Sequence, residues 1–227
     1  HAQLCRTVAL CKAQSVRYYL LGNGSNILFA DEGYDGAVLD ISSMQDAVEV
    51  HGTQLTAGAG VRLSALCKTA LEHGLTGLEF AYGIPGTVGG AVYMNAGAYG
   101  GEMKDVLTTV QYLTAEGEVK EAAAAELDLR YRHSIFEENG GCILSAQFAL
   151  TPGEPEAIRA KMDELMAKRL DKQPLDKPSA GSTFKRPVGA FAAALIDQCG
   201  LRGYRHGGAA VSEKHCGFVV NLGGATC

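Results

Sequence analysis

The sequence predicts an α+β protein. Three observations favour this class: short apolar runs that read as strands and hairpins, isolated amphipathic helices between them, and no regular alternation of strand and helix. The chain has 227 residues, of which 47% are hydrophobic and 20% charged. A chain of this length and composition can bury a large apolar core, so a disordered protein is excluded.

Short apolar runs and turn residues define the first part of the chain. Residues 4–11 read as the middle of a helix. The expected strands that follow are 16–21, 37–41, 47–50 and 55–59, the last two joined by a hairpin at His51-Gly52-Thr53.

A helix is expected from Leu63 onward. Its apolar residues recur at helical spacing and share one face: Leu63, Leu66, Cys67, Ala70 and Leu71. Gly74 follows at the position where glycine commonly ends a helix.

The second half mixes loops, strands and helices. Residues 83–101 are the most glycine-dense stretch and are expected to form a loop with one short helix. The other expected elements are hairpin strands at 106–113 and from 119, a half-buried strand at 142–150, a helix from Pro155 to about residue 172, a helix at 191–199 and a strand at 217–221. Prolines at both ends of 174–178 mark a domain boundary.

Composition excludes several classes of protein. The formal net charge of −5 argues against a nucleic-acid partner, because no net release of counterions would drive binding. No apolar run approaches the roughly 20 residues that span a bilayer, and no signal peptide is recognisable. Seven scattered cysteines are typical of reduced thiols. We therefore expect a soluble, cytoplasmic protein with no membrane partner.

The first of two glycine loops comprises Gly22, Asn23, Gly24, Ser25 and Asn26. Glycines let successive backbone N–H groups turn toward an anion, and the three polar side chains could add donors to phosphate oxygens. A tight turn between two strands explains the same residues equally well. The match to a Rossmann dinucleotide fingerprint is poor, because no third glycine has the required spacing.

The second glycine loop is richer than a structural turn requires. Its candidate ligand-binding residues are Gly83, Ile84, Pro85, Gly86, Gly89, Gly90, Asn95, Ala96, Gly97 and Tyr99. Ordering so many glycines is costly in backbone entropy, and close approach to a ligand would offset that cost. No Gly-Lys-Ser/Thr sequence follows either loop, which argues against a P-loop NTPase. The two loops together predict a bound dinucleotide whose diphosphate lies between them.

Cationic and hydroxyl side chains mark the second half. Arg169 and Lys172 end the helix from Pro155, where they either complement the helix dipole or pair with an anionic ligand; spacing favours the first role. Ser182 lies close to Lys185 and Arg186, which could support a developing negative charge. A Ser/Thr turn is the commoner explanation for such a serine.

Two other site classes are unsupported. The spacing of Cys199, His206, His215 and Cys216 matches no zinc motif, so no metal is expected. A serine hydrolase is equally weak, because the chain has no G-x-S-x-G nucleophile elbow.

Five stretches together resemble the UDP-N-acetylenolpyruvoylglucosamine reductases (MurB), flavoenzymes of bacterial peptidoglycan synthesis. They are LGNGSNIL from Leu21, AYGIPGTVGGAVYMNAGAYGGEM from Ala81, YRHSIF from Tyr131, KQPLDKPSAGSTFKRPVGAFAAALID from Lys172 and VSEKHCGFVVN from Val211. They cover nearly the whole chain in order. The uninterrupted path from Phe148 to Arg169 resembles the shorter form of the family, which lacks an extra tyrosine loop.

The resemblance implies an α+β flavoprotein of the vanillyl-alcohol-oxidase (PCMH) fold with a C-terminal α+β substrate domain. Residues 1–46 would belong to the first FAD-binding subdomain, 47–176 would form the second, and 177–227 would form the substrate domain. Both glycine loops would hold FAD. Since neither loop contains histidine, the FAD is expected to be non-covalent, and acid precipitation should leave it in the supernatant.

The resemblance also implies a reaction. NADPH would reduce FAD at N5, and UDP-N-acetylglucosamine enolpyruvate would then receive hydride at C3 and a proton at C2. Ser182 matches the acid that protonates C2, and Arg132 matches the arginine that polarises the substrate carboxylate. Substrate contacts are implied for Tyr131, Arg169, Lys172, Lys185 and Arg186. No other partner is implied, and a monomer is expected.

Two departures from the family pattern concern the ends of the chain. The chain begins at His1 and stops at Cys227, before the family's Leu-Glu-x-Glu motif with its catalytic glutamate, and the family's opening segment is also absent. Both ends are expected to be cut, so the sequence as printed should turn over slowly or not at all. Assays of NADPH oxidation with and without the missing termini test this, and full activity of the printed form would refute it.

Two alternatives to the reductase remain open. One is another flavin oxidoreductase of the same fold, which would consume oxygen without needing a UDP-sugar. The other is a non-catalytic FAD-binding fragment, which would show flavin absorbance but no reduction by NADPH.

Overall fold

A computed structural model describes residues 1–44 and 47–227 and divides them into two units. The first unit comprises His1–Gly24 and Asp35–Leu165, and the second comprises Ser25–Tyr34 and Met166–Cys227. The expected boundary between the two FAD-binding subdomains falls after residue 46, and that residue lies outside the described residues. The three-domain division remains a proposal.

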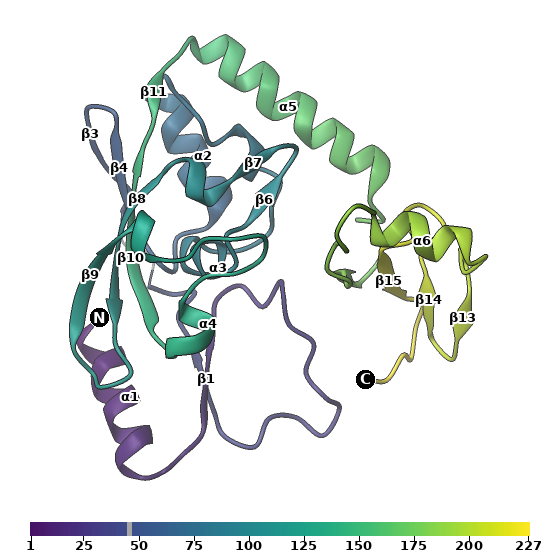
Figure 1. Ribbon diagram of the computed structural model, residues 1–227, viewed down its shortest axis with the longest axis horizontal. Coiled ribbons are helices and arrows are strands. Elements are labelled where there is room, and N and C mark those ends of the chain that lie inside the picture. Colours follow the sequence, from purple (N-terminus) through teal and green to yellow (C-terminus); the bar gives the residue numbers. More distant parts are fainter. Residues whose placement is uncertain (45–46) are drawn as a thin grey trace. The chain divides into compact units, whose positions relative to one another are not determined.

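A five-stranded antiparallel sheet forms the centre of the first unit (Figure 1). Its strand order is β3 (Glu49–His51), β4 (Gln54–Gly58), β10 (Cys142–Ala149), β8 (Leu107–Leu113) and β9 (Val119–Ala123). β10 lies in the middle, and its alternating residues Cys142, Leu144, Ala146 and Phe148 are all buried. The half-buried strand expected at 142–150 and both expected hairpins are therefore confirmed, with left-handed glycines at the turns.

Helix α2 (Leu63–Glu72) buries the predicted apolar face. Leu63, Leu66 and Ala70 are almost completely inaccessible, and the chain leaves the helix through Gly74, whose φ of +62° lies in the left-handed region. This φ angle explains why glycine occurs there, since a side chain would strain the turn.

Several other predicted elements of the first unit are confirmed. These are α1 (Ala2–Ala13), the parallel pair β1 (Tyr18–Leu21) and β2 (Ala37–Asp40), the short helix α3 (Val88–Tyr93) and the long helix α5 (Pro155–Lys172), whose later residues belong to the second unit. Short elements without a sequence signal were not predicted: β5 (Leu75–Thr76), β6 (Gly97–Ala98), β7 (Gly101–Glu102), β11 (Thr151–Pro152), α4 (Phe136–Asn139) and the 3-10 helices η1 (Glu79–Ala81), η2 (Met103–Asp105) and η3 (Ala124–Glu126).

One hydrophobic core joins the sheet to the helices of the first unit. Leu4 and Val8 of α1, Leu66 of α2, Val92 of α3 and Ile158 of α5 all contribute to it. All seven cysteines are free thiols, and burial raises the pKa of Cys67 and Cys142 to about 12. Such thiols are inert under ordinary conditions.

Adjacent glycines of α3 differ sharply in the room around them. A Cβ on Gly89 would lie 2.8 Å from the Cβ of Ala59, whereas a Cβ on Gly90 would meet nothing closer than 3.6 Å. We expect Gly89→Ala to lower the free energy of unfolding by roughly 1–3 kcal/mol through overpacking. Gly90→Ala is the matched control and should be neutral or slightly stabilising, because alanine favours helix. Equal urea midpoints for the two variants would contradict this account.

The second unit contains a four-stranded antiparallel sheet and one short helix (Figure 1). The strand order is β12 (Ser179–Ser182), β15 (Phe218–Asn221), β14 (Ala209–Val211) and β13 (Arg205–His206), and the helix is α6 (Ala192–Gln198). β15 and α6 confirm the sequence predictions, whereas the other three strands were not foreseen. Ala210, Phe218 and Val220 are buried residues of its strands, and Cys216, just before β15, is buried as well.

Of the helices formed by residues 1–44 and 47–227, none combines the length and hydropathy needed to span a bilayer.

Candidate functional site

The first glycine loop begins where β1 ends. Gly22 is partly buried, and Gly24 adopts a φ of +64°, which favours glycine. Asn23, Ser25 and Asn26 are exposed. The first segment of the first unit ends at Gly24, so Ser25 and Asn26 are described with the second unit.

The second glycine loop turns into α3. Thr87 is the N-cap residue of this helix and is 1% exposed; its Oγ1 accepts a long hydrogen bond from the Gly90 N–H at 3.5 Å. The N–H groups of Val88 and Gly89 donate to the carbonyls of Val61 and Ala59, which fixes the turn against the core. Of the predicted ligand-binding residues in this part of the loop, Pro85 and Gly90 are exposed, whereas Gly83, Ile84 and Gly86 are half-buried and Gly89 is buried.

The two glycine loops touch each other. A Cβ built on Gly22 would lie only 2.6 Å from Thr87 Oγ1, so the backbone of the first loop lies directly against the N-cap of α3. Only glycine allows this approach. The structure thus brings the start of the first loop and the middle of the second to one place in the first unit.

Gly22→Ala tests the importance of this contact. The added methyl group should push the loops apart, and we expect it to weaken, by about tenfold or more, binding of the FAD that the resemblance implies. Thr87→Ala in the same chain removes the opposing hydroxyl and should recover most of the affinity, because the clash is with that atom. The measurement is titration of the flavin-free protein with FAD. Equal losses in the single and double variants would show that the contact between the loops is unimportant.

The second loop continues into the hairpin of β6 and β7. Its two central residues, Tyr99 and Gly100, have φ angles of +53° and +92°, as a type I′ turn requires. The Tyr99 side chain is 45% exposed, whereas Ala96 and Gly97 are half-buried. A Cβ on Gly97 would lie 2.7 Å from the carbonyl oxygen of Gly101, so the closeness of the two strands requires glycine here.

Asn95 differs from its neighbours because it is completely buried. Its Nδ2 donates to Glu102 Oε2 at 2.9 Å and to the Arg130 carbonyl at 3.0 Å, while its Oδ1 accepts from the Lys104 N–H at 3.0 Å. The side chain therefore bonds to protein groups in every direction. Its predicted role as a cofactor ligand remains a prediction; in the structure both Nδ2 hydrogens and Oδ1 are bonded to protein groups.

Arg132 is attached to the second glycine loop. Its Nη2 donates to the Gly97 carbonyl at 2.7 Å, and its Nη1 lies 3.4 Å from the Asn95 carbonyl. The guanidinium carbon also lies 5.1 Å from the centre of the Tyr131 ring, a cation–π contact. Tyr131 is 42% exposed, so the aromatic face and the cation lie together at the surface of the first unit.

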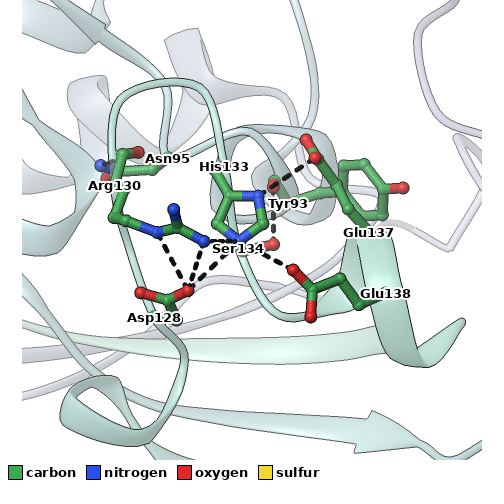
Figure 2. Close-up of polar contacts among 8 residues, drawn as sticks. All are labelled: Tyr93, Asn95, Asp128, Arg130, His133, Ser134, Glu137 and Glu138. Atoms are coloured by element: carbon green, nitrogen blue, oxygen red, sulfur yellow. Dashed lines mark hydrogen bonds and ion pairs between the residues drawn. The ribbon is translucent and has the colours of Figure 1, made fainter.

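The turn that carries Arg132 has strained backbone. Arg132 has a φ of +54°, which is rare for a residue other than glycine, and Asp128 has +45°. Figure 2 shows the polar contacts around this turn: His133 Nδ1 lies 3.1 Å from Glu137 Oε2, and Ser134 Oγ donates to the Tyr93 carbonyl at 2.6 Å. Strained residues held by such contacts are common at functional sites.

Charge pairing also shapes this region. The hydrogen bond from Arg130 lowers the pKa of the Asp128 carboxyl, and the charge of Arg130 acts in the same direction. The pKa of Glu102 is lowered chiefly by its hydrogen bond with Lys104, and the charge of Arg132 adds to this effect. Both carboxylates are therefore ionised at neutral pH.

Ser182 lies at the end of β12 in the second unit, exposed to solvent. A Cβ on Gly217 would lie 3.3 Å from Ser182 Oγ and 2.9 Å from His215 Cε1, so the hydroxyl and the imidazole flank one glycine. His215 Nδ1 accepts a hydrogen bond from the Gly217 N–H at 3.1 Å, which leaves the proton of the neutral ring on Nε2. Sequence reasoning considered His215 only as a metal ligand and missed its position beside Ser182.

The predicted substrate-binding cations of the second unit lie in two places. Arg169 and Lys172 occupy the last turn of α5, where Arg169 is half-buried and Lys172 exposed. Lys185 and Arg186 follow β12, and the guanidinium carbon of Arg186 lies 4.7 Å from the centre of the Phe191 ring. The structure describes these cations within the second unit and Arg132 within the first.

Metal ligation and cavities also bear on the site. Among the described residues, no three His, Cys, Asp or Glu side chains gather in a way that could hold a metal ion. A cavity of about 540 Å³ in the second unit is lined by the end of α5, residues 173–177 and residues 212–214, and it does not include Ser182.

Comparisons with known proteins identify the family of the chain. A family profile described as "FAD binding domain" matches residues 1–123, and one described as "UDP-N-acetylenolpyruvoylglucosamine reductase, C-terminal domain" matches 173–227. The UDP-N-acetylenolpyruvoylglucosamine reductase of Agathobacter rectalis is 52% identical over 99% of this chain and 75% of its own length. The chain belongs to the UDP-N-acetylenolpyruvoylglucosamine reductase family.

Other members of the UDP-N-acetylenolpyruvoylglucosamine reductase family match over the same range. The Clostridioides difficile reductase is 48% identical over 99% of this chain and 74% of its own length. The crystal structure of the Thermus caldophilus reductase (MurB) is 38% identical, has a TM-score of 0.84, and is matched over 96% of this chain and 79% of its own. The predicted resemblance and the predicted fold, an FAD-binding domain followed by the family's C-terminal domain, are thereby confirmed.

Proposed function

We propose that the protein reduces UDP-N-acetylglucosamine enolpyruvate, the substrate that its relatives' names describe, to UDP-N-acetylmuramate with NADPH, through FAD. The observation that carries this proposal is the assembly in the first unit: two glycine loops meet at Gly22 and Thr87, and Arg132 is held by the carbonyl of Gly97. A cofactor bound at the loops would therefore lie close to a fixed cation.

The residues present fit FAD. A diphosphate needs backbone N–H groups that no side chain shields. Gly24 and Gly90 offer such backbone, because both are exposed and a Cβ on either would meet nothing closer than 3.6 Å. Gly22, Asn23 and Gly24 of the first loop and Gly83–Gly90 of the second would hold the cofactor, with Ser25, Asn26, Ala96, Gly97 and Tyr99 as further contacts. When bound, FAD would carry hydride from NADPH to C3 of the enolpyruvyl group.

Arg132 and Ser182 would handle the charge that this transfer creates. As hydride reaches C3, negative charge develops on C2 and on the carboxylate of the substrate. The Arg132 guanidinium, whose fork suits a carboxylate, would stabilise that charge. The Ser182 hydroxyl would give its proton to C2 and complete the reduction.

The remaining cations would bind the anionic groups of the UDP-sugar. Arg169, Lys172, Lys185 and Arg186 are proposed for this role, and Tyr131 would line the enolpyruvyl subsite next to Arg132. Arginine and lysine both bind phosphate well. We further propose that the protein works as a cytoplasmic monomer without membrane or nucleic-acid partners. Its net charge of −5 disfavours the nucleic-acid partner.

The test is an anaerobic titration of the FAD-loaded protein. After one equivalent of NADPH has bleached the flavin, UDP-N-acetylglucosamine enolpyruvate should restore the yellow colour with matching formation of UDP-N-acetylmuramate. Reoxidation by molecular oxygen alone, with no response to the enolpyruvyl substrate, would contradict the proposal and favour an oxidase of the same fold.

A further inference from the structure

Asn95 connects the cofactor loop with the turn that carries Arg132. Its Nδ2 donates to the carbonyl of Arg130, which lies 35 residues away in sequence and two residues before Arg132. Its own carbonyl lies 3.4 Å from Arg132 Nη1. One residue of the glycine loop thus contacts both the backbone of the turn and the guanidinium that the turn presents.

The side-chain amide of Asn95 is buried and bonded to protein groups. The side chain is 0% exposed, and both Nδ2 hydrogens and Oδ1 are bonded to protein groups. Its φ of +38° is tolerated by asparagine better than by most other residues. A buried amide with all of its bonds satisfied specifies one arrangement, because any shift leaves a polar group without a partner.

In the proposed function, recognition of the substrate carboxylate depends on where the Arg132 guanidinium is held. Small displacements of a positioned cation cost much of its effect on a reacting group. The position of Arg132 depends on contacts with the second glycine loop. The Asn95 side chain bonds to the Arg130 carbonyl in the strained turn, and two loop carbonyls accept bonds from the Arg132 guanidinium.

We propose that Asn95 is a positioning residue, which fixes Arg132 relative to the flavin loop and so links cofactor binding to recognition of the substrate carboxylate. The inference rests on the proposed function. Asn95 touches neither cofactor nor substrate in this proposal; it acts through Arg132.

Asn95→Asp is the sharpest variant. Aspartate keeps the size and tolerates the same φ angle, but it replaces the donor by a carboxylate that faces Glu102 and the Arg130 carbonyl. We expect the FAD-saturated variant to bind UDP-N-acetylglucosamine enolpyruvate about tenfold more weakly, measured by perturbation of the flavin spectrum. Asn95→Ser is the second variant and should show a smaller loss in the same direction.

Two further substitutions test whether the effect of Asn95 is specific: Thr108→Val is the control, and Arg132→Ala provides the background for a double variant. Thr108→Val removes a half-buried bond to the Gln147 carbonyl in the central sheet and should leave substrate affinity unchanged. In an Arg132→Ala background, Asn95→Asp should cause no additional loss, because the guanidinium that it positions is gone.

Three outcomes would overturn the inference. They are an equal loss with and without Arg132, an unchanged substrate affinity in both Asn95 variants, and failure of both variants to hold FAD at saturating concentration. Failure of the unsubstituted, FAD-loaded protein to bind the enolpyruvyl substrate would instead contradict the proposed function, so the two failures are distinguishable.

Discussion

Alanine in place of Ser182 is expected to slow reoxidation of the reduced flavin by the enolpyruvyl substrate by roughly 10²–10⁴-fold, the range typical of a positioned general acid. Reduction of the flavin by NADPH should keep its rate, because no proton needs to reach C2 in that step. The reason for a local effect is structural: Ser182 is exposed at the end of β12, so removal of its hydroxyl leaves no buried cavity. Stopped-flow absorbance resolves the two half-reactions.

Ser179→Ala is the matched control for Ser182. It lies on the same strand, is also exposed, and its Oγ accepts only a local bond from the Gly181 N–H at 3.3 Å. Both half-reactions of the Ser179 variant should remain normal. If Ser182→Ala slowed both half-reactions by the same factor, the hydroxyl would have a structural role and the assignment of the acid would be wrong.

Replacement of Arg132 should produce the second large effect. We expect Arg132→Ala to slow the oxidative half-reaction by about 10²–10³-fold, the usual cost of losing one group that stabilises developing charge. Arg132→Lys keeps the charge but loses the planar fork, so it should recover only part of the rate. Rapid-reaction kinetics at saturating substrate separates this effect from weaker binding.

Arg130→Ala is the control for charge in the same turn. Arg130 pairs with Asp128 at 2.6 Å and is exposed, while its carbonyl, which Asn95 binds, is unaffected by the substitution. The Arg130 variant should therefore retain most of the activity. An Arg130 effect as large as that of Arg132 would show that net positive charge, not the placed guanidinium, matters.

Local patterns predicted most of the long elements. The helical spacing from Leu63 and the alternation around β10 were correct, because each reflects one buried face. The two-residue strands β6 and β7 carried no such pattern. They form because Tyr99 and Gly100 turn the chain back on itself, and Tyr99 was interpreted only as a ligand contact.

The site was predictable only in part. The loops and the candidate residues could be recognised from composition and from motifs that resemble the family, but their contacts are long-range. Thr87 against Gly22, Asn95 against Arg130, and Ser182 beside His215 each join residues at least 33 positions apart. Sequence periodicity holds no information on such pairs, so the bonds of the Asn95 amide to Glu102, Arg130 and Lys104 could not be predicted.

A visible absorption spectrum of the purified protein, followed by anaerobic addition of NADPH, is the most direct test that the contacting loops bind a redox dinucleotide. The account predicts flavin absorbance that disappears as NADPH is consumed in equal amount. Protein that remains colourless after reconstitution with FAD, even when it is extended by the terminal segments of its longer relatives, would contradict it.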